Sequence, residues 1–236
     1  MDRIRLVLSD YDRTFTDGTL HVAPGLAETI GRLRERGVLF SVVSGRKFPF
    51  MMDFYSSMDG LVDSFIAENG CIGYVKGCRQ VICEAGHRDE LLQTLDREAI
   101  PYDAGDVVIS VHARHQPRLE QVLDGYPAYH LIRNVDSIMV LPRGASKATG
   151  IRWLMDMYCV GIGQMACIGD AENDLDMRGN CSLMGAVANA LPAVKRESDY
   201  VCRESFGAGL LEFLEHIEEM QDARWPRGDA RAPLSD

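Results

Sequence analysis

Short apolar segments alternate with segments of helical periodicity through the first third of the chain. Apolar residues recur at helical spacing in Leu26, Ile30 and Leu33. The segment VLFSVVSG is almost wholly apolar, which is typical of a parallel strand that is covered on both faces. The expected elements are a strand at 4–9, a helix at 25–37, a strand at 38–45, a helix at 48–58 and a strand at 64–70.

The same alternation returns after residue 145. We expect a helix at 146–158, a strand at 164–170, a short helix at 172–179, a strand at 181–187 and a helix at 207–220. Strands that alternate with helices imply a parallel, doubly wound sheet with right-handed crossovers. The sequence therefore predicts an α/β protein with a Rossmann-like core.

The pattern changes between these two halves. Four strands (79–85, 106–113, 129–135 and 137–142) and two helices (88–99 and 116–126) are expected there. This grouping predicts a small α+β module inserted into the core. The predicted domains are a core over 1–75 and 146–222, an insertion over 76–145, and a tail over 223–236 whose composition predicts disorder.

Composition and charge exclude several classes of protein. The net charge of −10 and the absence of a Lys/Arg cluster argue against nucleic-acid binding. No apolar run approaches the roughly 18–20 residues that cross a bilayer, and the first residues lack a signal peptide, so we expect a cytoplasmic protein away from membranes. Seven scattered cysteines without a C-x-x-C pair fit reduced thiols and make zinc improbable. The sequence is compatible with a monomer and with a homodimer.

Polar residues follow the expected strands at the carboxyl edge of the sheet, where ligands bind in such folds. They are Asp10 and Asp12 after the first strand, Ser44, Gly45 and Arg46 at the end of the second, Glu68 and Asn69 at the end of the third, and Asp170, Asn173 and Asp174 at the end of the strand at 164–170, with Lys147 opening the helix that leads into that strand. A single Asp or Asn at such a place is usually a turn or cap residue. Four converging carboxylates, however, repel one another unless a hard cation such as Mg²⁺ binds.

Four motifs in order resemble those of the haloacid dehalogenase superfamily of phosphatases. They are DYDRT at 10–14, VVSGR at 42–46, Lys147 within GASKATG, and GDAENDLDM at 169–177. ENG at 68–70 and VANALPAVKRESDYV at 187–201 extend the resemblance over nearly all of residues 4–215. The insertion stands where the Cof-type branch of this superfamily carries its cap domain.

The resemblance implies a Mg²⁺-dependent phosphomonoester hydrolase. Asp10 would be the nucleophile that forms an aspartyl phosphate, and Asp12 the general acid and base. Mg²⁺ would be bound by Asp10, the main-chain carbonyl of Asp12 and Asp170, with Asp174 as a further ligand or a support. The phosphate-binding residues implied by the motifs are Ser44, Gly45, Lys147 and Asn173.

The small cap, the ENG junction and the chain length look like those of the archaeal phosphoglycolate phosphatases, which implies 2-phosphoglycolate as the substrate. Cationic partners for its carboxylate would come from His112, Arg114 and Arg133 in the cap, or from Arg13 and Arg46 in the core. A sugar-phosphate or trehalose-phosphate phosphatase, a phosphosugar mutase and an inactive phosphate-binding module remain alternatives.

Overall fold

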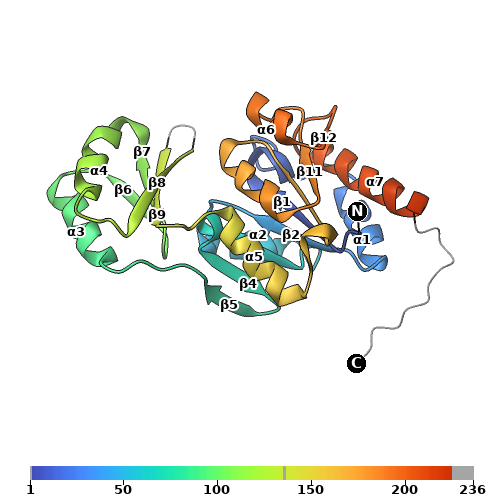
Figure 1. Ribbon diagram of the computed structural model, residues 1–236, viewed down its shortest axis with the longest axis horizontal. Coiled ribbons are helices and arrows are strands. Elements are labelled where there is room, and N and C mark those ends of the chain that lie inside the picture. Colours follow the sequence, from blue (N-terminus) through green and yellow to red (C-terminus); the bar gives the residue numbers. More distant parts are fainter. Residues whose placement is uncertain (1, 135–136, 225–236) are drawn as a thin grey trace.

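The computed structural model describes residues 2–134 and 137–224 and divides the chain into a large core and a smaller cap, which lie side by side in Figure 1. The core holds an eight-stranded sheet in the order β12-β11-β10-β1-β2-β3-β4-β5. Its strands are β1 (Leu6–Asp10), β2 (Leu39–Val43), β3 (Ser64–Ala67), β4 (Ile72–Val75), β5 (Cys78–Val81), β10 (Met165–Gly169), β11 (Leu183–Ala186) and β12 (Tyr200–Val201).

The sheet is parallel from β12 to β3, while β4 and β5 add an antiparallel edge. At its centre, Val7 of β1 is in register with Ala166 of β10 and with Phe40 of β2. All five residues of β1 are buried, as expected for a strand that is covered on both faces. The predicted α/β class is therefore confirmed, with a mixed edge added to the parallel sheet.

Among the described residues, five α-helices flank the core sheet. They are α1 (Leu26–Glu35), α2 (Phe48–Ser57), α5 (Lys147–Tyr158), α6 (Pro192–Glu197) and α7 (Phe206–Arg224). Helix α1 packs beside α7, and α5 packs against β3 and β4. Short helical turns at Tyr11–Phe15, Glu68–Gly70 and Glu172–Asn180 follow β1, β3 and β10, so the carboxyl end of each of these strands leads into a compact turn.

The cap is an antiparallel sheet in the order β6-β7-β9-β8 with two helices. Its elements are α3 (Arg88–Arg97), β6 (Tyr102–Ala104), β7 (Ile109–His112), α4 (Gln116–Leu123), β8 (Tyr129–Asn134) and β9 (Ser137–Pro142). Leu91, Leu95 and Leu119 of the helices pack on Ile109 and Val140 of the sheet. This apolar cluster is separate from that of the core, so the cap has its own hydrophobic interior.

The segment 79–85 was expected as a strand of the insertion, but its strand β5 lies at the edge of the core sheet. Lys76 and Gly77, both with positive φ, form a two-residue turn that folds β5 back onto β4. Four short elements, β4, β6, α6 and β12, are not indicated by the sequence pattern. Helix α7 includes residues 223–224 of the expected tail; residues 225–236 of that tail, and residue 135 of the expected strand 129–135, lie outside the described residues.

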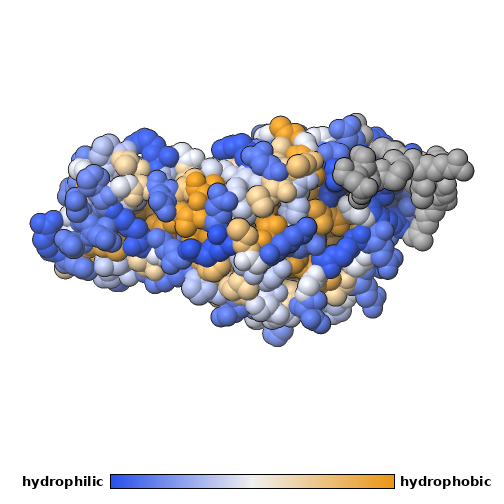
Figure 2. Space-filling model, turned by 90° about the horizontal axis from the view of Figure 1, so that it is seen from below, coloured by the Kyte–Doolittle hydropathy of each residue, from blue (hydrophilic) through white to orange (hydrophobic). Residues whose placement is uncertain are grey.

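Seen from below, polar side chains cover most of the surface, and hydrophobic ones show in patches near the junction of the two units and on the core (Figure 2). Within residues 2–134 and 137–224, no helix has the length and hydropathy that a membrane span requires.

Candidate active site

The carboxyl ends of neighbouring core strands bring the expected polar residues together. Strand β1 ends in Asp10, Ser44 and Gly45 follow β2, and Asp170 follows β10. Because β10, β1 and β2 are adjacent and parallel, these residues meet at one edge of the sheet. The predicted arrangement at the sheet edge is thus present in the structure.

Three buried carboxylates form the base of the site. Asp10, Asp170 and Asp174 each place an oxygen within 4.8 Å of the others. Asp174 is fixed by its own turn, since its Oδ2 accepts the N–H groups of Asp170 at 2.8 Å and Ala171 at 3.0 Å. A side chain at Gly169 would place its Cβ 2.4 Å from Cγ of Asp174, so this close approach requires glycine.

The ammonium of Lys147 joins two of these carboxylates. Lys147 is the first residue of α5, and its Nζ lies 2.5 Å from Oδ1 of Asp10 and 2.6 Å from Oδ1 of Asp174. Burial by itself lowers the pKa of Lys147, but the charges of Asp10 and Asp174 outweigh it and raise that pKa above its usual value. The side chain is therefore a fixed positive charge inside the core.

Burial and mutual repulsion disfavour the negatively charged form of the carboxylates. Burial, and then the charge of Asp174, raises the pKa of Asp10 well above its usual range. The same two causes raise the pKa of Asp170 to about 7, against the opposing charge of Arg13. Carboxylate oxygens in this arrangement suit a hard divalent cation, which would relieve the repulsion. The three residues therefore fit a metal site.

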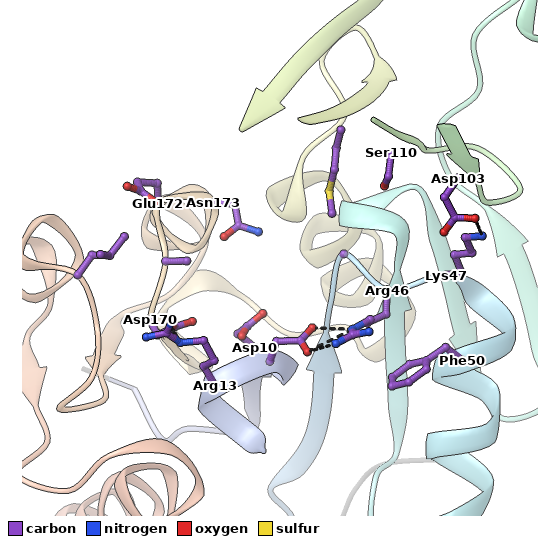
Figure 3. A pocket seen from close by; sticks show the side chains of 15 residues that line it. Asp10, Arg13, Arg46, Lys47, Phe50, Asp103, Ser110, Asp170, Glu172 and Asn173 are labelled. Carbon is purple, nitrogen blue, oxygen red and sulfur yellow. Dashed lines mark hydrogen bonds and ion pairs between the residues drawn. The ribbon is translucent and has the colours of Figure 1, made fainter. Parts of the chain in front are cut away.

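A cavity of about 560 Å³ opens above these groups, between core and cap (Figure 3). It is lined by Asp10, Asp12, Arg13, Gly45, Arg46, Lys47, Phe50, Asp103, Ser110, Met139, Asp170, Ala171, Glu172, Asn173 and Leu191. Of the eight expected catalytic, metal-binding and phosphate-binding residues, five are in this lining, as are Arg13 and Arg46. Three others, Ser44, Lys147 and Asp174, are buried beneath it.

The turn after β2 supports the floor of the cavity from below. Oγ of Ser44 accepts the N–H of Arg46 at 3.0 Å, and its main-chain carbonyl accepts the N–H of Asn69 at 3.0 Å. Asn173 approaches from the opposite side, where its Nδ2 lies 3.5 Å from Oδ1 of Asn69. Gly45 thus presents main chain to the cavity, while Ser44 holds the turn in shape.

Every cationic side chain in the cavity lining faces a carboxylate. Arg13 lies 3.2 Å from Asp170. Arg46 lies 2.6 Å from Asp12, with its guanidinium 4.8 Å from the centre of the Phe50 ring. Lys47 forms an ion pair with Asp103 of the cap (Figure 3). An anionic ligand would compete with these carboxylates for the cations.

The cations of this cavity come from the core, whereas three cationic residues of the cap were also expected there. Among the described residues, His112 and Arg114 are absent from the cavity lining, and Arg133 lines a neighbouring cleft instead. Nδ1 of His112 accepts the N–H of Arg114, and Nε of Arg114 lies 3.0 Å from Nε2 of His115. The side chains of His112 and Arg114 are therefore engaged at the exposed end of β7.

Several residues of the lining were not singled out from the sequence. Lys47 could have been, because it directly follows the motif VVSGR. Phe50 one helical turn later, and Asp103, Ser110 and Met139 of the cap, carry no such signal. Ser110 and Met139 become neighbours only through the pairing of β7 with β9.

The fold and the site together define an α/β protein with a cap above an acidic, cation-compatible centre. The chain matches the family of haloacid dehalogenase-like hydrolases over residues 7–98 and 103–214. It is also 30% identical to a phosphoglycolate phosphatase of Sulfurisphaera tokodaii, over 90% of this chain and 93% of that one. The chain therefore belongs to the haloacid dehalogenase-like hydrolases, and the resemblance noted in its motifs is confirmed.

Other relatives agree with this assignment. Phosphoglycolate phosphatase 2 of Saccharolobus solfataricus is 27% identical over 90% of this chain and 91% of that protein. The crystal structure of Thermoplasma acidophilum 0175 superposes with a TM-score of 0.80 at 20% identity, covering 92% of this chain and 99% of the other. At this identity, the likeness to the solved structure concerns the fold.

Proposed function

We propose that the protein is a Mg²⁺-dependent phosphomonoesterase whose substrate is 2-phosphoglycolate. One observation carries the proposal: a carboxylate, Asp10, lies at the cavity floor and is held 2.5 Å from the buried ammonium of Lys147. A nucleophilic carboxylate needs a fixed orientation and nearby positive charge when it approaches an anionic phosphate. Family membership and the four ordered motifs support the same chemistry.

In the proposed mechanism, Asp10 attacks phosphorus and the bond from phosphorus to the ester oxygen breaks, which leaves an aspartyl phosphate. Asp12 gives its proton to the leaving oxygen and afterwards takes one from the water that attacks the aspartyl phosphate. Phosphate is released and Asp10 is restored. The main chain of Gly45, supported by Ser44, and the ammonium of Lys147 would hold the phosphoryl oxygens, with Asn173 at the opposite wall.

The acidic centre is where Mg²⁺ would bind. Asp10 and Asp170 would be ligands, together with the main-chain carbonyl of Asp12, and Asp174 would be a ligand or hold the others in place. The bound ion would supply positive charge that lets the Asp10 carboxylate approach an anionic phosphate. Arg13, now 3.2 Å from Asp170, would be released from that carboxylate and become available to a substrate.

Charge, more than size, favours a small phosphorylated acid. A cavity of about 560 Å³ is within the usual range for small-molecule sites, so its volume admits a sugar phosphate as well. However, Arg13, Arg46 and Lys47 offer three cations, and a phosphate ester with a second anionic group would use more of them than a neutral sugar would. The relatives named phosphoglycolate phosphatase support this choice.

The test is release of inorganic phosphate from a panel of esters in the presence of Mg²⁺. The panel contains 2-phosphoglycolate, hexose phosphates, trehalose phosphate and p-nitrophenyl phosphate. We expect the highest kcat/KM with 2-phosphoglycolate. A tenfold preference for a sugar phosphate would retain the phosphatase chemistry and overturn the substrate. A positional isomer of a sugar phosphate as product, without free phosphate, would instead indicate a mutase.

A further inference from the structure

Glu68 is a buried carboxylate of the core that accepts hydrogen bonds from the cap. It lies in the turn after β3 and has no exposed surface. Its Oε2 accepts the N–H groups of Val107 at 2.8 Å and Val108 at 2.9 Å, and its Oε1 accepts that of Asp106 at 3.0 Å. These three donors are consecutive residues of the loop between β6 and β7. One core side chain thus binds the main chain of a cap loop.

The cost of burying Glu68 makes this contact specific. A buried carboxylate is strongly unfavourable unless its oxygens are hydrogen-bonded. Among the described residues, no lysine or arginine forms an ion pair with Glu68, so main-chain N–H groups supply most of the compensation. The N–H of Phe48 in the core also reaches Oε1, at 3.4 Å, but the three loop N–H groups make the shorter contacts, so moving the loop would leave the carboxylate with too few donors.

The loop fits closely around Glu68. A Cβ at Gly105 would lie 2.6 Å from Oε1 of Glu68, so only glycine allows this approach without a shift. Glu68 itself has a φ of 52°, a left-handed conformation that is uncommon for a residue with a side chain. Such a conformation persists where the surrounding contacts fix it. Gly105 of the cap and the backbone of Glu68 in the core are therefore both adapted to this contact.

The bound loop connects two parts of the cavity wall. Asp103 precedes it on β6 and Ser110 follows it on β7, and both side chains point into the cavity (Figure 3). The next residue of the turn, Asn69, has its Nδ2 2.5 Å from Sδ of Met139 on β9, which also lines the cavity. The turn at Glu68–Gly70 thus contacts the cap at the loop between β6 and β7 and at strand β9.

We propose that Glu68 is a positioning residue that sets the place of the cap over the active site. It is not part of the cavity lining among the described residues, so its effect on substrate passes through Asp103, Ser110 and Met139. The inference rests on the proposed function insofar as the cap side of the cavity binds the organic part of a phosphate ester. The position of the cap, by contrast, can be measured without any substrate.

The test compares two variants that disrupt the contact from opposite sides with one matched control. In Glu68→Gln, the side-chain NH₂ group replaces an oxygen acceptor and faces the main-chain N–H donors of the loop. In Gly105→Ala, the added methyl group pushes the loop away from an intact Glu68. Asp106→Asn removes only the exposed ion pair of Asp106 with Arg79 and keeps the main-chain N–H. The Gly105→Ala substitution lies in the cap and leaves every core residue unchanged, so it remains informative if Glu68→Gln does not fold.

The first readout is amide hydrogen exchange. In both disrupting variants, we expect the amides of residues 106–108 to exchange about tenfold faster or more, while β1 and β10 keep their protection. Asp106→Asn should match the wild type. Unchanged exchange at 106–108 in Gly105→Ala and Glu68→Gln would overturn the proposal.

The second readout separates cap position from damage to the core. We expect KM for 2-phosphoglycolate to rise about tenfold in both disrupting variants, while inhibition by inorganic phosphate, which needs only the core groups, changes by less than about twofold. An equal loss of phosphate binding would show a damaged core and overturn the positioning role. If the wild type hydrolyses no phosphate ester, the proposed function fails, and the exchange readout still decides the role of Glu68.

Discussion

Nζ of Lys147 lies 2.5 Å from Oδ1 of Asp10, and neither side chain has more than a trace of exposed surface. The ion pair connects the first residue of α5 to the last residue of β1 at the base of the cavity. The same ammonium also reaches Asp174. Removing it would leave three buried carboxylates without their internal cation.

Lys147→Met is therefore expected to affect both stability and turnover. Breaking a buried ion pair from one side costs about 3–5 kcal/mol in the free energy of unfolding. We expect a loss of that order in the metal-free variant, part of which saturating Mg²⁺ restores, and a fall in kcat on the order of 10³-fold. Urea denaturation with and without Mg²⁺ measures the first effect. Lys195→Met, which removes an amine that donates to the main-chain carbonyl of Ala188, is the control and should lose less than about 1 kcal/mol.

Asp10→Asn should abolish turnover without unfolding the protein. The amide cannot act as the nucleophile, while Lys147 keeps Asp174 as a partner and preserves the core. Removing divalent cations from the wild type with a chelator should abolish turnover as well, and adding Mg²⁺ should restore it in the wild type alone. Phosphate release and the thermal midpoint are the measurements. Activity of either sample above a few per cent would contradict the proposed roles.

Asp12→Asn should slow turnover according to the leaving group. The substitution keeps the main-chain carbonyl but removes the proton donor, so kcat should fall by about 10²- to 10⁴-fold for an alkyl phosphate. The loss should be much smaller for p-nitrophenyl phosphate, whose leaving oxygen needs little protonation. Mg²⁺ affinity should stay near the wild-type value. An equal loss on both esters would argue against Asp12 as the general acid.

Lys47→Met tests which side of the cavity binds a second anionic group. Because Lys47 points into the cavity from the core, we expect KM for 2-phosphoglycolate to rise about tenfold and KM for p-nitrophenyl phosphate to change little. Asp103→Asn breaks the same ion pair but keeps the cation, so it should leave KM unchanged or lower it. Arg114→Met, outside the lining, is expected to have no effect. A rise in KM for Arg114→Met alone would move the binding group to the cap.

Glu212 predicts a pH dependence of stability away from the active site. Burial opposes its ionisation, but the N–H groups of Arg203 and Glu204 and the hydroxyl of Tyr200, at 2.8–3.0 Å, outweigh burial and lower the pKa of Glu212. A lowered pKa in the folded protein adds stability above the usual carboxyl pKa, and this stability is lost as the pH falls through the lowered value.

Glu212→Gln is accordingly expected to cost about 1–2 kcal/mol of unfolding free energy at pH 7 and progressively less below about pH 4. Urea denaturation of variant and wild type at several pH values gives the difference directly. Glu215→Gln, on the exposed side of the same helix, is the matched control. A difference for Glu212→Gln that does not shrink at low pH would contradict the account.

The core and the acidic centre were predictable because each depends on local patterns. Strand ends mark where Asp10, Ser44 and Asp170 lie, and a parallel sheet brings such ends together without any need for detailed packing. The proposed role of Lys147 rests on the resemblance of its motif. Its contacts with both Asp10 and Asp174 depend on how α5 packs, and the sequence gives no direct signal for that.

The cap side of the cavity was not predictable because it depends on tertiary packing, as the contacts of Lys147 do. Lys47 and Asp103 meet across two units, whereas His112, Arg114 and Arg133 were expected as partners of the substrate because they are cationic side chains in strands or at strand ends. Strand β5 was placed in the insertion because it adjoins it in the chain, whereas a two-residue turn at Lys76 returns it to the core. Such pairings depend on tertiary geometry, which periodicity does not encode.

The position of β1 between β2 and β10 has a consequence for the growing chain on the ribosome. Strand β2 follows β1 closely, but β10 begins only at Met165, and Lys147 is 137 residues from Asp10. The central strand of the sheet therefore keeps one edge unpaired through most of synthesis, while the cap strands, all between Tyr102 and Pro142, can pair as soon as they emerge. A stalled or truncated chain that ends before β10 would expose this edge of β1, where a strand of another chain could pair with it.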